Sequence, residues 1–279
     1  MDGRALAARI RERVAEEARP LAPLALATIL VGEDPASEIY ISHKHAAAEE
    51  AGIAAVDIRL PAEVPQSEVL ERIARLNADD EIDGILVQTP LPDHIDVDAV
   101  QAAVDPAKDV DGFHPLNAGL LYLGRPAHVP ATPLGIMALL AEYRIPVEGA
   151  RAVVVGRSPI VGRPVAALLT HANATVTVCH SRTVELQRHT LDADILVAAI
   201  GIPGTIAPDM VKQGSTVIDV GITRTDAGLV GDVDPGAAGL AAYMTPVPGG
   251  VGPMTIALVL EGTLRAARYR RGMLAFPRV

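Results

Sequence analysis

Short apolar runs alternate with longer amphipathic stretches along the whole chain. In the first half, the runs Ala25–Val31, Ala54–Leu60 and Gly84–Gln88 are strand candidates, and helix candidates at Pro35–Ala51 and Ser67–Leu76 lie between them. Several of these runs do not alternate apolar with polar residues, which is typical of parallel strands buried on both faces. Strand–helix–strand order with short connections predicts right-handed crossovers and an α/β fold.

The second half repeats this pattern. Its strand candidates are Arg151–Val155, Ala174–Cys179, Asp194–Ile200 and Thr216–Val220, and Pro133–Tyr143 is a helix candidate before them. The best-marked helix in the chain starts in the first half, with Asp34 as N-cap and Pro35 in the first turn, and it ends at Gly52.

A chain of 279 residues is expected to form two domains. We place the first at residues 1–120 and the second at 121–254, with the Gly-, Pro- and Asn-rich segment Pro115–Thr132 as part of the junction. Met254–Arg271 has the pattern of a long terminal helix, so residues 255–279 are expected to return to the first domain. The expected architecture is two three-layer α/β domains flanking a cleft, the second of them Rossmann-like.

Composition narrows the range of functions. The 24 Lys and Arg against 34 Asp and Glu give a net charge of −10, which argues against general binding to nucleic acid or anionic membranes. The single cysteine, Cys179, cannot form an internal disulfide, and the N-terminal stretch is amphipathic rather than signal-like. We therefore expect a cytoplasmic protein with no membrane segment.

The segment RAVVVGRSPIVGRP has the order of a strand, a glycine turn and a helix. Such a turn directs backbone N–H groups towards an anion, usually a dinucleotide pyrophosphate. Gly156 and Gly162 are separated by five residues, however, and the middle glycine of the usual G-x-G-x-x-G pattern is missing. Taken alone, the turn is equally compatible with a packing role.

The next strand candidate ends in His180-Ser181-Arg182-Thr183. An NAD site normally has an acidic residue near this position to hold the ribose hydroxyls. Ser181 and Arg182 supply a hydroxyl and a guanidinium instead, which suit the ribose phosphate of NADP. Arg157 in the glycine turn is a candidate second cation for the same phosphate. The alternative is that Arg182 is one solvated arginine among 21.

Tyr40 and Lys44 are four residues apart on one helix candidate and therefore share a face. A tyrosine ring can stack on a flat heterocycle while the amine reaches its reactive atom. Only three of the 24 basic residues are lysine, and a buried lysine can lose its proton whereas an arginine cannot. An exposed helical lysine is the alternative interpretation.

Two further segments add candidate chemistry. Gln88 ends a buried strand, at the edge where α/β domains collect ligands. Asp109 and Asp111 precede a glycine, and one carboxylate could hold an amidine-like ring edge through two hydrogen bonds. We expect no metal, because DVDG lacks the remaining ligands of a calcium loop, and His43 and His45 point in divergent directions on a helix.

The segment TPVPGGVGPMT, residues 245–255, precedes the terminal helix. Its prolines stiffen the backbone and its glycines allow close approach to a ligand. Pro248 and Gly250 are candidate substrate contacts, and a rigid interdomain turn is the alternative role.

In this order, the segments VGEDPAS, YISHK, GILVQTPLP, KDVDGFHP, ATPLG, VVGRSPIVGRP, VIDVGI, GDVD and TPVPGGVGPMT resemble the bifunctional methylenetetrahydrofolate dehydrogenase/cyclohydrolase family. The resemblance covers nearly the whole chain. Departures are Ala131 where cysteine is frequent, Thr89 where leucine is common, and His45 and Ala46 where basic residues are usual. The last pair bears on contacts with the folate tail.

The resemblance implies an NADP-dependent oxidation of methylenetetrahydrofolate to methenyltetrahydrofolate, followed by hydrolysis to formyltetrahydrofolate, in a homodimer. By position, Lys44 is the key cyclohydrolase residue, Gln88 positions its amine, Tyr40 stacks on the folate and Asp111 holds the pterin. The positions that match NADP contacts of the family, or carry its glycine turn and phosphate ligands, are Gly156, Arg157, Ser158, Gly162, Ser181, Arg182 and Ile222.

Three alternatives remain at this point. The first is a dehydrogenase of the same fold with little cyclohydrolase activity. The second is a Rossmann-type NADP dehydrogenase for another small substrate, against which DVDGFHP beside YISHK argues. The third is a non-catalytic NADP-binding protein, against which the set Lys44, Gln88 and Asp111 argues.

Overall fold

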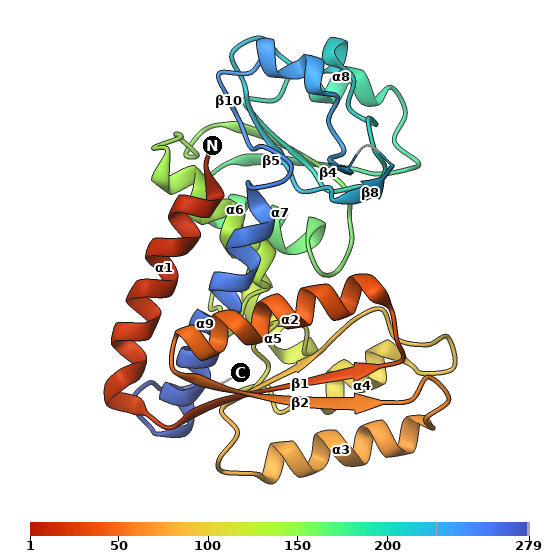
Figure 1. Cartoon of the computed structure of the whole chain (residues 1–279). Coiled ribbons are helices and arrows are strands. Elements are labelled where there is room, and N and C mark those ends of the chain that lie inside the picture. Colours follow the sequence, from red (N-terminus) through yellow and green to blue (C-terminus); the bar gives the residue numbers. More distant parts are fainter. Residues whose placement is uncertain (227, 278–279) are drawn as a thin grey trace. The chain divides into compact units, whose positions relative to one another are not determined.

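The computed structural model describes residues 1–226 and 228–277, which form two compact units (Figure 1). The first unit comprises Ala8–Ala131 and Ile256–Val279, and the second comprises Met1–Ala7 and Thr132–Thr255. The division therefore passes through two helices, α1 (Gly3–Ala18) and α9 (Val251–Arg270).

The first unit is built on a three-stranded parallel sheet in the order β2-β1-β3. Its strands are β1 (Leu24–Val31), β2 (Ile53–Leu60) and β3 (Gly84–Val87). Its helices, besides the greater parts of α1 and α9, are α2 (Pro35–Glu50), α3 (Gln66–Ala78), α4 (Val97–Ala103) and α5 (Pro115–Tyr122). A 3₁₀ turn at Arg19–Leu21 connects α1 to β1. The predicted strands and the parallel pairing are confirmed.

Helices cover both faces of this sheet, which explains why β1 is buried along its whole length. In Figure 1, α2 lies on one face and α3 on the other. On the α3 face, Ile29 of β1 joins a core with Val69 and Ile73 of α3. The start of α2 is fixed by the Asp34 carboxylate, which accepts a hydrogen bond from Ser37 N at 2.8 Å. The strand β2 is then reached through Gly52, whose φ is +72°.

The second unit contains a five-stranded parallel sheet in the order β10-β7-β6-β4-β5. Its strands are β4 (Arg151–Val155), β5 (Thr175–Cys179), β6 (Ile195–Ala198), β7 (Thr216–Asp219) and β10 (Tyr243–Met244), with a separate hairpin of β8 (Thr223–Thr225) and β9 (Gly228–Val230). Its helices are α6 (Ala131–Glu142, which begins at the division), α7 (Gly162–His171) and α8 (Leu186–Thr190), with 3₁₀ turns at Pro208–Met210 and Pro235–Gly239. This doubly wound order confirms the Rossmann-like expectation.

The segment Pro115–Thr132 differs from its expected role as a junction. It contains the helix α5, in which Leu120 and Leu121 are buried, and Asn117 is buried beside Asp109. These contacts make the segment part of the first unit, so the division lies at 131/132 rather than at 120/121. Residues 1–7, expected in the first domain, group by their contacts with the second unit.

Two backbone contacts explain why the first residues belong to the second unit. Gly3 N donates to Gly249 O at 3.1 Å, and the amino group of Met1 donates to Met244 O at 2.6 Å. A Cβ at Gly3 would lie 1.8 Å from Gly250 O, so only glycine allows this approach.

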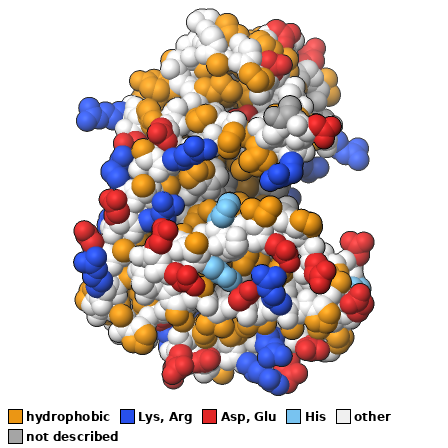
Figure 2. Space-filling model, in the orientation of Figure 1, with side chains coloured by type: hydrophobic (Ala, Val, Ile, Leu, Met, Phe, Trp, Pro, Cys, Tyr) orange, Lys and Arg blue, Asp and Glu red, His pale blue; other side chains and the backbone are white. Residues whose placement is uncertain are grey.

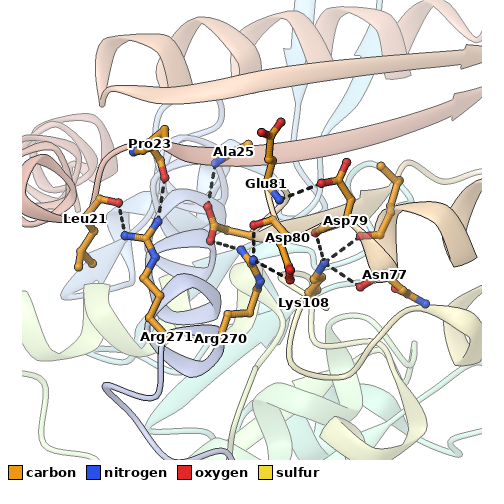
Figure 3. A network of polar contacts seen from close by, with 12 residues as sticks. Leu21, Pro23, Ala25, Asn77, Asp79, Asp80, Glu81, Lys108, Arg270 and Arg271 are labelled. Carbon is orange, nitrogen blue, oxygen red and sulfur yellow. Dashed lines mark hydrogen bonds and ion pairs between the residues drawn. The ribbon is translucent and has the colours of Figure 1, made fainter.

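The C-terminal half of α9 is fastened to the first unit by charged groups (Figure 3). Arg270 donates to the buried Asp83 carboxylate at 2.6 Å, and Arg271 donates to the carbonyl oxygens of Leu21 and Pro23. In the same view, Lys108 donates to three backbone carbonyl groups where α3 ends, at 2.7–2.9 Å. Its compact ammonium group supplies the three donors that this helix terminus needs.

On the face drawn in Figure 2, basic side chains are interspersed with acidic ones. Within residues 1–226 and 228–277, no helix is both long enough and apolar enough to cross a membrane.

Candidate active site

The first group of candidate residues lies on α2. Lys44 is only 5% exposed, and its Nζ lies 5.1 Å from the centroid of the Tyr40 ring, one helical turn earlier. This spacing places the ammonium group within range of a cation–π interaction. The predicted shared face of Tyr40 and Lys44 is therefore confirmed, and the exposed-lysine alternative is wrong.

Gln88 follows β3 and holds the Lys44 amine from the sheet side. Its backbone N–H donates to Ile29 O at 2.9 Å, which continues the ladder with β1. Its Oε1 accepts a hydrogen bond from Lys44 Nζ at 3.2 Å, and its Nε2 donates to Thr89 O at 2.8 Å. The second bond fixes which end of the amide faces the lysine.

Asp111 lies on a loop that leaves the same edge of the sheet. The loop begins beside β3, where Asp109 forms a parallel bridge with Ile85. Asp109 is buried, and its Oδ2 accepts hydrogen bonds from His114 N and Asn117 Nδ2, both at 2.8 Å. Asp109 thus closes the loop, whereas Asp111 is partly buried and interacts electrostatically with Lys44.

The electrostatics of this cluster are dominated by burial. Burial lowers the pKa of the Lys44 amine, and the Asp111 charge opposes that shift. Burial raises the pKa of Asp111 to about 6, against the effect of the Lys44 charge. Because burial lowers its pKa, a larger fraction of the Lys44 amine is neutral than in an exposed lysine, and only the neutral amine can accept a proton.

The first unit thus brings together an aromatic ring, an amine, an amide and a carboxylate. They come from three segments, α2, the end of β3 and the 109–114 loop. Beside a flat heterocycle, the ring offers a stacking surface, the carboxylate accepts N–H groups and the amine accepts or delivers a proton. This combination suits acid–base chemistry on a bound heterocyclic ring.

The second group of candidate residues lies at the carboxyl edge of the second unit's sheet. The register pairs Val155 with Cys179 on one side and with Ala198 on the other. Because the strand order reverses at β4, its carboxyl end is the topological switch point where such sheets bind ligands.

Gly156 occupies this switch point. Its φ is +129°, and a Cβ there would lie 2.1 Å from Ala199 O in the loop after β6. Gly162 is equally constrained, since a Cβ would lie 2.3 Å from Gly156 O. The two glycines let three backbone segments approach closely, which is the geometry of a dinucleotide cradle despite the missing middle glycine.

The hydrogen-bond acceptor for the backbone N–H groups at the start of α7 was not predicted from the sequence. Ser158 Oγ accepts hydrogen bonds from Val161 N at 3.1 Å and Gly162 N at 3.3 Å. These two N–H groups are therefore already paired and are not free for an anion. The signal was available, because serine side chains often accept hydrogen bonds from backbone N–H groups a few residues further along the chain.

Ser181 and Arg182 are exposed and follow β5, next to the Gly156 turn. The turn is shaped by His180, whose N–H donates to Thr183 Oγ1 at 2.8 Å and whose Nδ1 accepts from Arg182 N at 3.2 Å. The side chains of Ser181 and Arg182 therefore lie on a defined turn, and Arg157 is exposed on the neighbouring one. A hydroxyl and two guanidinium groups at this edge fit a phosphorylated ribose.

The remaining candidates lie near the start of α9. Ile222 is exposed after β7, and Pro248 is exposed in the 245–255 segment. Gly250 is buried, and a Cβ there would lie 2.7 Å from Pro246 O. Its role in the structure is therefore a close backbone approach, so any contact of Gly250 with a ligand is made by the main chain.

These features define a class of enzyme, an α/β protein with a nucleotide-binding unit of doubly wound topology and a second unit that carries acid–base side chains. A family model described as tetrahydrofolate dehydrogenase/cyclohydrolase, catalytic domain, matches residues 1–111. The model of its NAD(P)-binding domain matches residues 130–271. The chain belongs to the tetrahydrofolate dehydrogenase/cyclohydrolase family.

Individual relatives agree with this assignment. The chain is 58% identical to the bifunctional protein FolD of Acidiphilium cryptum over 275 residues, which covers 97% of this chain and 98% of the relative. The crystal structure of the bifunctional enzyme FolD from Campylobacter jejuni matches with a TM-score of 0.94 and 48% identity, covering 96% and 98% of the two chains. The Trypanosoma brucei enzyme, solved with NADP cofactor and inhibitor, matches with a TM-score of 0.93 and 39% identity, covering 99% and 98%.

Proposed function

We propose that the protein oxidises 5,10-methylenetetrahydrofolate with NADP and then hydrolyses the resulting 5,10-methenyltetrahydrofolate to 10-formyltetrahydrofolate. The observation that carries this proposal is the cluster of Tyr40, Lys44, Gln88 and Asp111 in a chain of the dehydrogenase/cyclohydrolase family. A dehydrogenase alone would need orientation of the folate but not a buried amine held by an amide oxygen.

In the hydrolytic step, water adds to the cationic methenyl carbon and loses a proton, and the bond from this carbon to N5 then breaks as N5 takes up a proton. The buried Lys44 amine is suited to accept that proton once it is neutral, and Gln88 Oε1 fixes its position. Tyr40 stacks on the folate, and Asp111 holds the pterin ring through its N–H groups.

The hydride chemistry of the oxidative step would be supplied by bound NADP, so the chain's own contribution is to bind and align the reactants. Gly156 and Gly162 let the backbone approach the cofactor, while Arg157, Ser158, Ser181, Arg182 and Ile222 contact it. Pro248 and Gly250 contact the folate. The structural support is the fit of the second unit's carboxyl edge to a phosphorylated dinucleotide.

One assay tests the proposal. With 5,10-methylenetetrahydrofolate and NADP, the absorbances of NADPH and of methenyltetrahydrofolate are followed together. We expect NADPH to form with little lasting accumulation of the methenyl compound. Accumulation at the rate of NADPH formation would indicate a dehydrogenase alone, and no NADPH would contradict the proposal.

Arg182→Ala should raise the KM for NADP by roughly 10- to 150-fold, because losing one charge-assisted hydrogen bond costs about 1.5–3 kcal/mol. Kinetics with NAD should change much less. Arg188→Ala removes an exposed arginine of α8 that pairs with Glu185 and is the matched control. Equal losses with both cofactors would show that Arg182 does not bind the ribose phosphate.

We also propose a homodimer that uses the second unit. Large apolar side chains are exposed there, including Ile202 at 60% and Val184 at 78%. Light scattering at micromolar concentration should report about twice the chain mass of 29.1 kDa. A monomer at every accessible concentration would contradict this proposal.

The cyclohydrolase should show a pH dependence set by the Lys44–Asp111 pair. If neutral Lys44 is the acceptor, kcat/KM rises with pH through the pKa of Lys44. Because the Asp111 charge raises that pKa, Asp111→Asn should move the rise to lower pH. Profiles normalised to their own maxima measure the shift, and Asp98→Asn, an exposed change on α4, is the control. An unchanged or upward-shifted profile would contradict the assignment.

The compartment is proposed to be the cytoplasm. Cys179 is buried and unpaired, which suits a reducing environment.

A further inference from the structure

Asp219 joins three backbone segments of the second unit. It is the last residue of β7, it is buried, and its Oδ1 accepts hydrogen bonds from Gly221 N at 3.1 Å and Asp232 N at 2.9 Å. Its Oδ2 accepts a third from Val233 N at 3.0 Å. Its own N–H donates to Thr245 Oγ1 at 2.8 Å, at the start of the 245–255 segment. Both carboxylate oxygens are thus committed to backbone donors.

The Asp232 carboxylate extends the network to the loop after β6. Its Oδ2 accepts hydrogen bonds from Ile200 N at 2.6 Å and Gly201 N at 3.0 Å, directly after β6. Its Oδ1 is buried and has no hydrogen-bond partner. The two aspartates therefore differ, because Asp219 uses both oxygens and Asp232 uses one.

Two glycines make room for these carboxylates. A Cβ at Gly231 would lie 1.9 Å from Asp219 Oδ2, and a Cβ at Gly221 would lie 2.2 Å from Asp232 Oδ1. The sequence segments VIDVGI and GDVD therefore pack together as one structural unit, in which each aspartate lies against a glycine of the other segment.

The network of Asp219 and Asp232 lies beside the proposed cofactor site. Ala198 of β6 pairs with Asp219 of β7, so the loops after these strands leave the sheet at the same level. Both loops lie on the same side of the switch point at Gly156, and the loop after β7 carries Ile222. The bonds of Asp219 and Asp232 fix how these loops approach one another.

We propose that Asp219 and Asp232 are positioning residues for NADP, holding the loops after β6 and β7 and the 231–233 segment in the arrangement that the cofactor needs. The inference rests on the proposed function only in its choice of NADP as the ligand. Neither aspartate contacts the cofactor in this proposal, since their oxygens face backbone atoms.

The electrostatic cost of the arrangement supports a positional role. Burial raises the pKa of Asp219 to about 6, and the nearby Asp232 charge adds to that shift. Apolar residues would fill the same space without two adjacent buried carboxyl groups. What apolar residues cannot do is accept the N–H groups of five backbone positions on three segments.

The unequal use of oxygens gives a specific test. In Asp232→Asn, the amide oxygen can accept from Ile200 and Gly201 while the NH₂ group takes the place of the unpartnered Oδ1. In Asp219→Asn, the NH₂ group must face at least one backbone N–H, which leaves that donor unpaired. If the two aspartates acted only through their charge, Asp219→Asn and Asp232→Asn would have the same effect.

The experiment compares Asp219→Asn, Asp232→Asn and Asp232→Ala in the full chain, by calorimetric NADP binding and by kinetics of both activities. We expect Asp219→Asn and Asp232→Ala to raise the Kd and KM for NADP at least about tenfold, with a smaller change in kcat. Asp232→Asn should remain within about threefold of the wild type, because its acceptor oxygen is retained. Hydrolysis of supplied methenyltetrahydrofolate, which needs no cofactor, should be unchanged in all three.

Asp234→Ala is the matched control, because this aspartate lies in the same segment but caps the 3₁₀ turn at Pro235–Gly239 through Gly236 N at 2.7 Å. NADP binding of wild-type strength in Asp232→Ala, equal effects of the two asparagine variants, or a parallel loss of hydrolysis would each overturn the inference. A wild-type chain that binds NADP without converting folate would refute the proposed function alone, and the Kd values would still decide the inference. A wild-type chain that does not bind NADP would overturn both.

Discussion

Replacing Lys44 by arginine should lower the cyclohydrolase rate at least about a hundredfold, since general acid–base groups contribute about 10²–10⁴-fold. Arginine preserves the positive charge but stays protonated, so it cannot accept a proton from the attacking water. Hydride transfer depends mainly on alignment, and dehydrogenase activity should survive better. The direct readout is methenyltetrahydrofolate, which should accumulate as NADPH forms.

Two further variants separate proton transfer from binding at this site. Gln88→Ala removes the oxygen that accepts from Lys44 Nζ at 3.2 Å, so it should lower hydrolysis in the same direction by misplacing the amine. Asp111→Ala should weaken both activities, because it removes the contact with the pterin. A Lys44→Arg enzyme that hydrates methenyltetrahydrofolate at nearly the original rate would refute the role of the amine.

The hydrophobic pattern was sufficient to predict most of the strands of both sheets. Buried parallel strands such as β1 and β4 are continuous apolar runs, and that signal is local. The division between the units was misplaced because it depends on contacts distant in sequence. Asn117 of α5 becomes part of the first unit through Asp109, and Gly3 joins the second through Gly249.

The candidate site was predictable where spacing or strand ends determine position. Tyr40 and Lys44 share a face because they are four residues apart, and Gln88 follows a strand. The hydrogen bonds that Ser158 accepts before α7 and the network of Asp219 and Asp232 were not predicted. For the two aspartates, the partners are backbone N–H groups, which every residue except proline carries, so the sequence holds no distinctive partner to search for.

Gly156→Ala should abolish most dehydrogenase activity and leave hydrolysis of supplied methenyltetrahydrofolate intact. The new Cβ would lie 2.1 Å from Ala199 O, and the φ of +129° is strained for alanine. The loops after β4 and β6 must therefore separate at the proposed cofactor site. Because a misplacement of about 1 Å can cost about a hundredfold in rate, we expect kcat/KM for NADP to fall by about that factor.

The control is Gly239→Ala, at the end of the 3₁₀ turn in the same unit, where no atom lies within 4 Å of the new Cβ and φ is not positive. It should change neither activity, and this result would exclude a general sensitivity of the unit to added methyl groups. Lys44→Arg and Gly156→Ala then separate the chemistry by unit, because the first loses hydrolysis and the second loses oxidation. Near-normal NADP kinetics in Gly156→Ala would show that the turn after β4 has only a packing role, which is the alternative left open by its missing middle glycine.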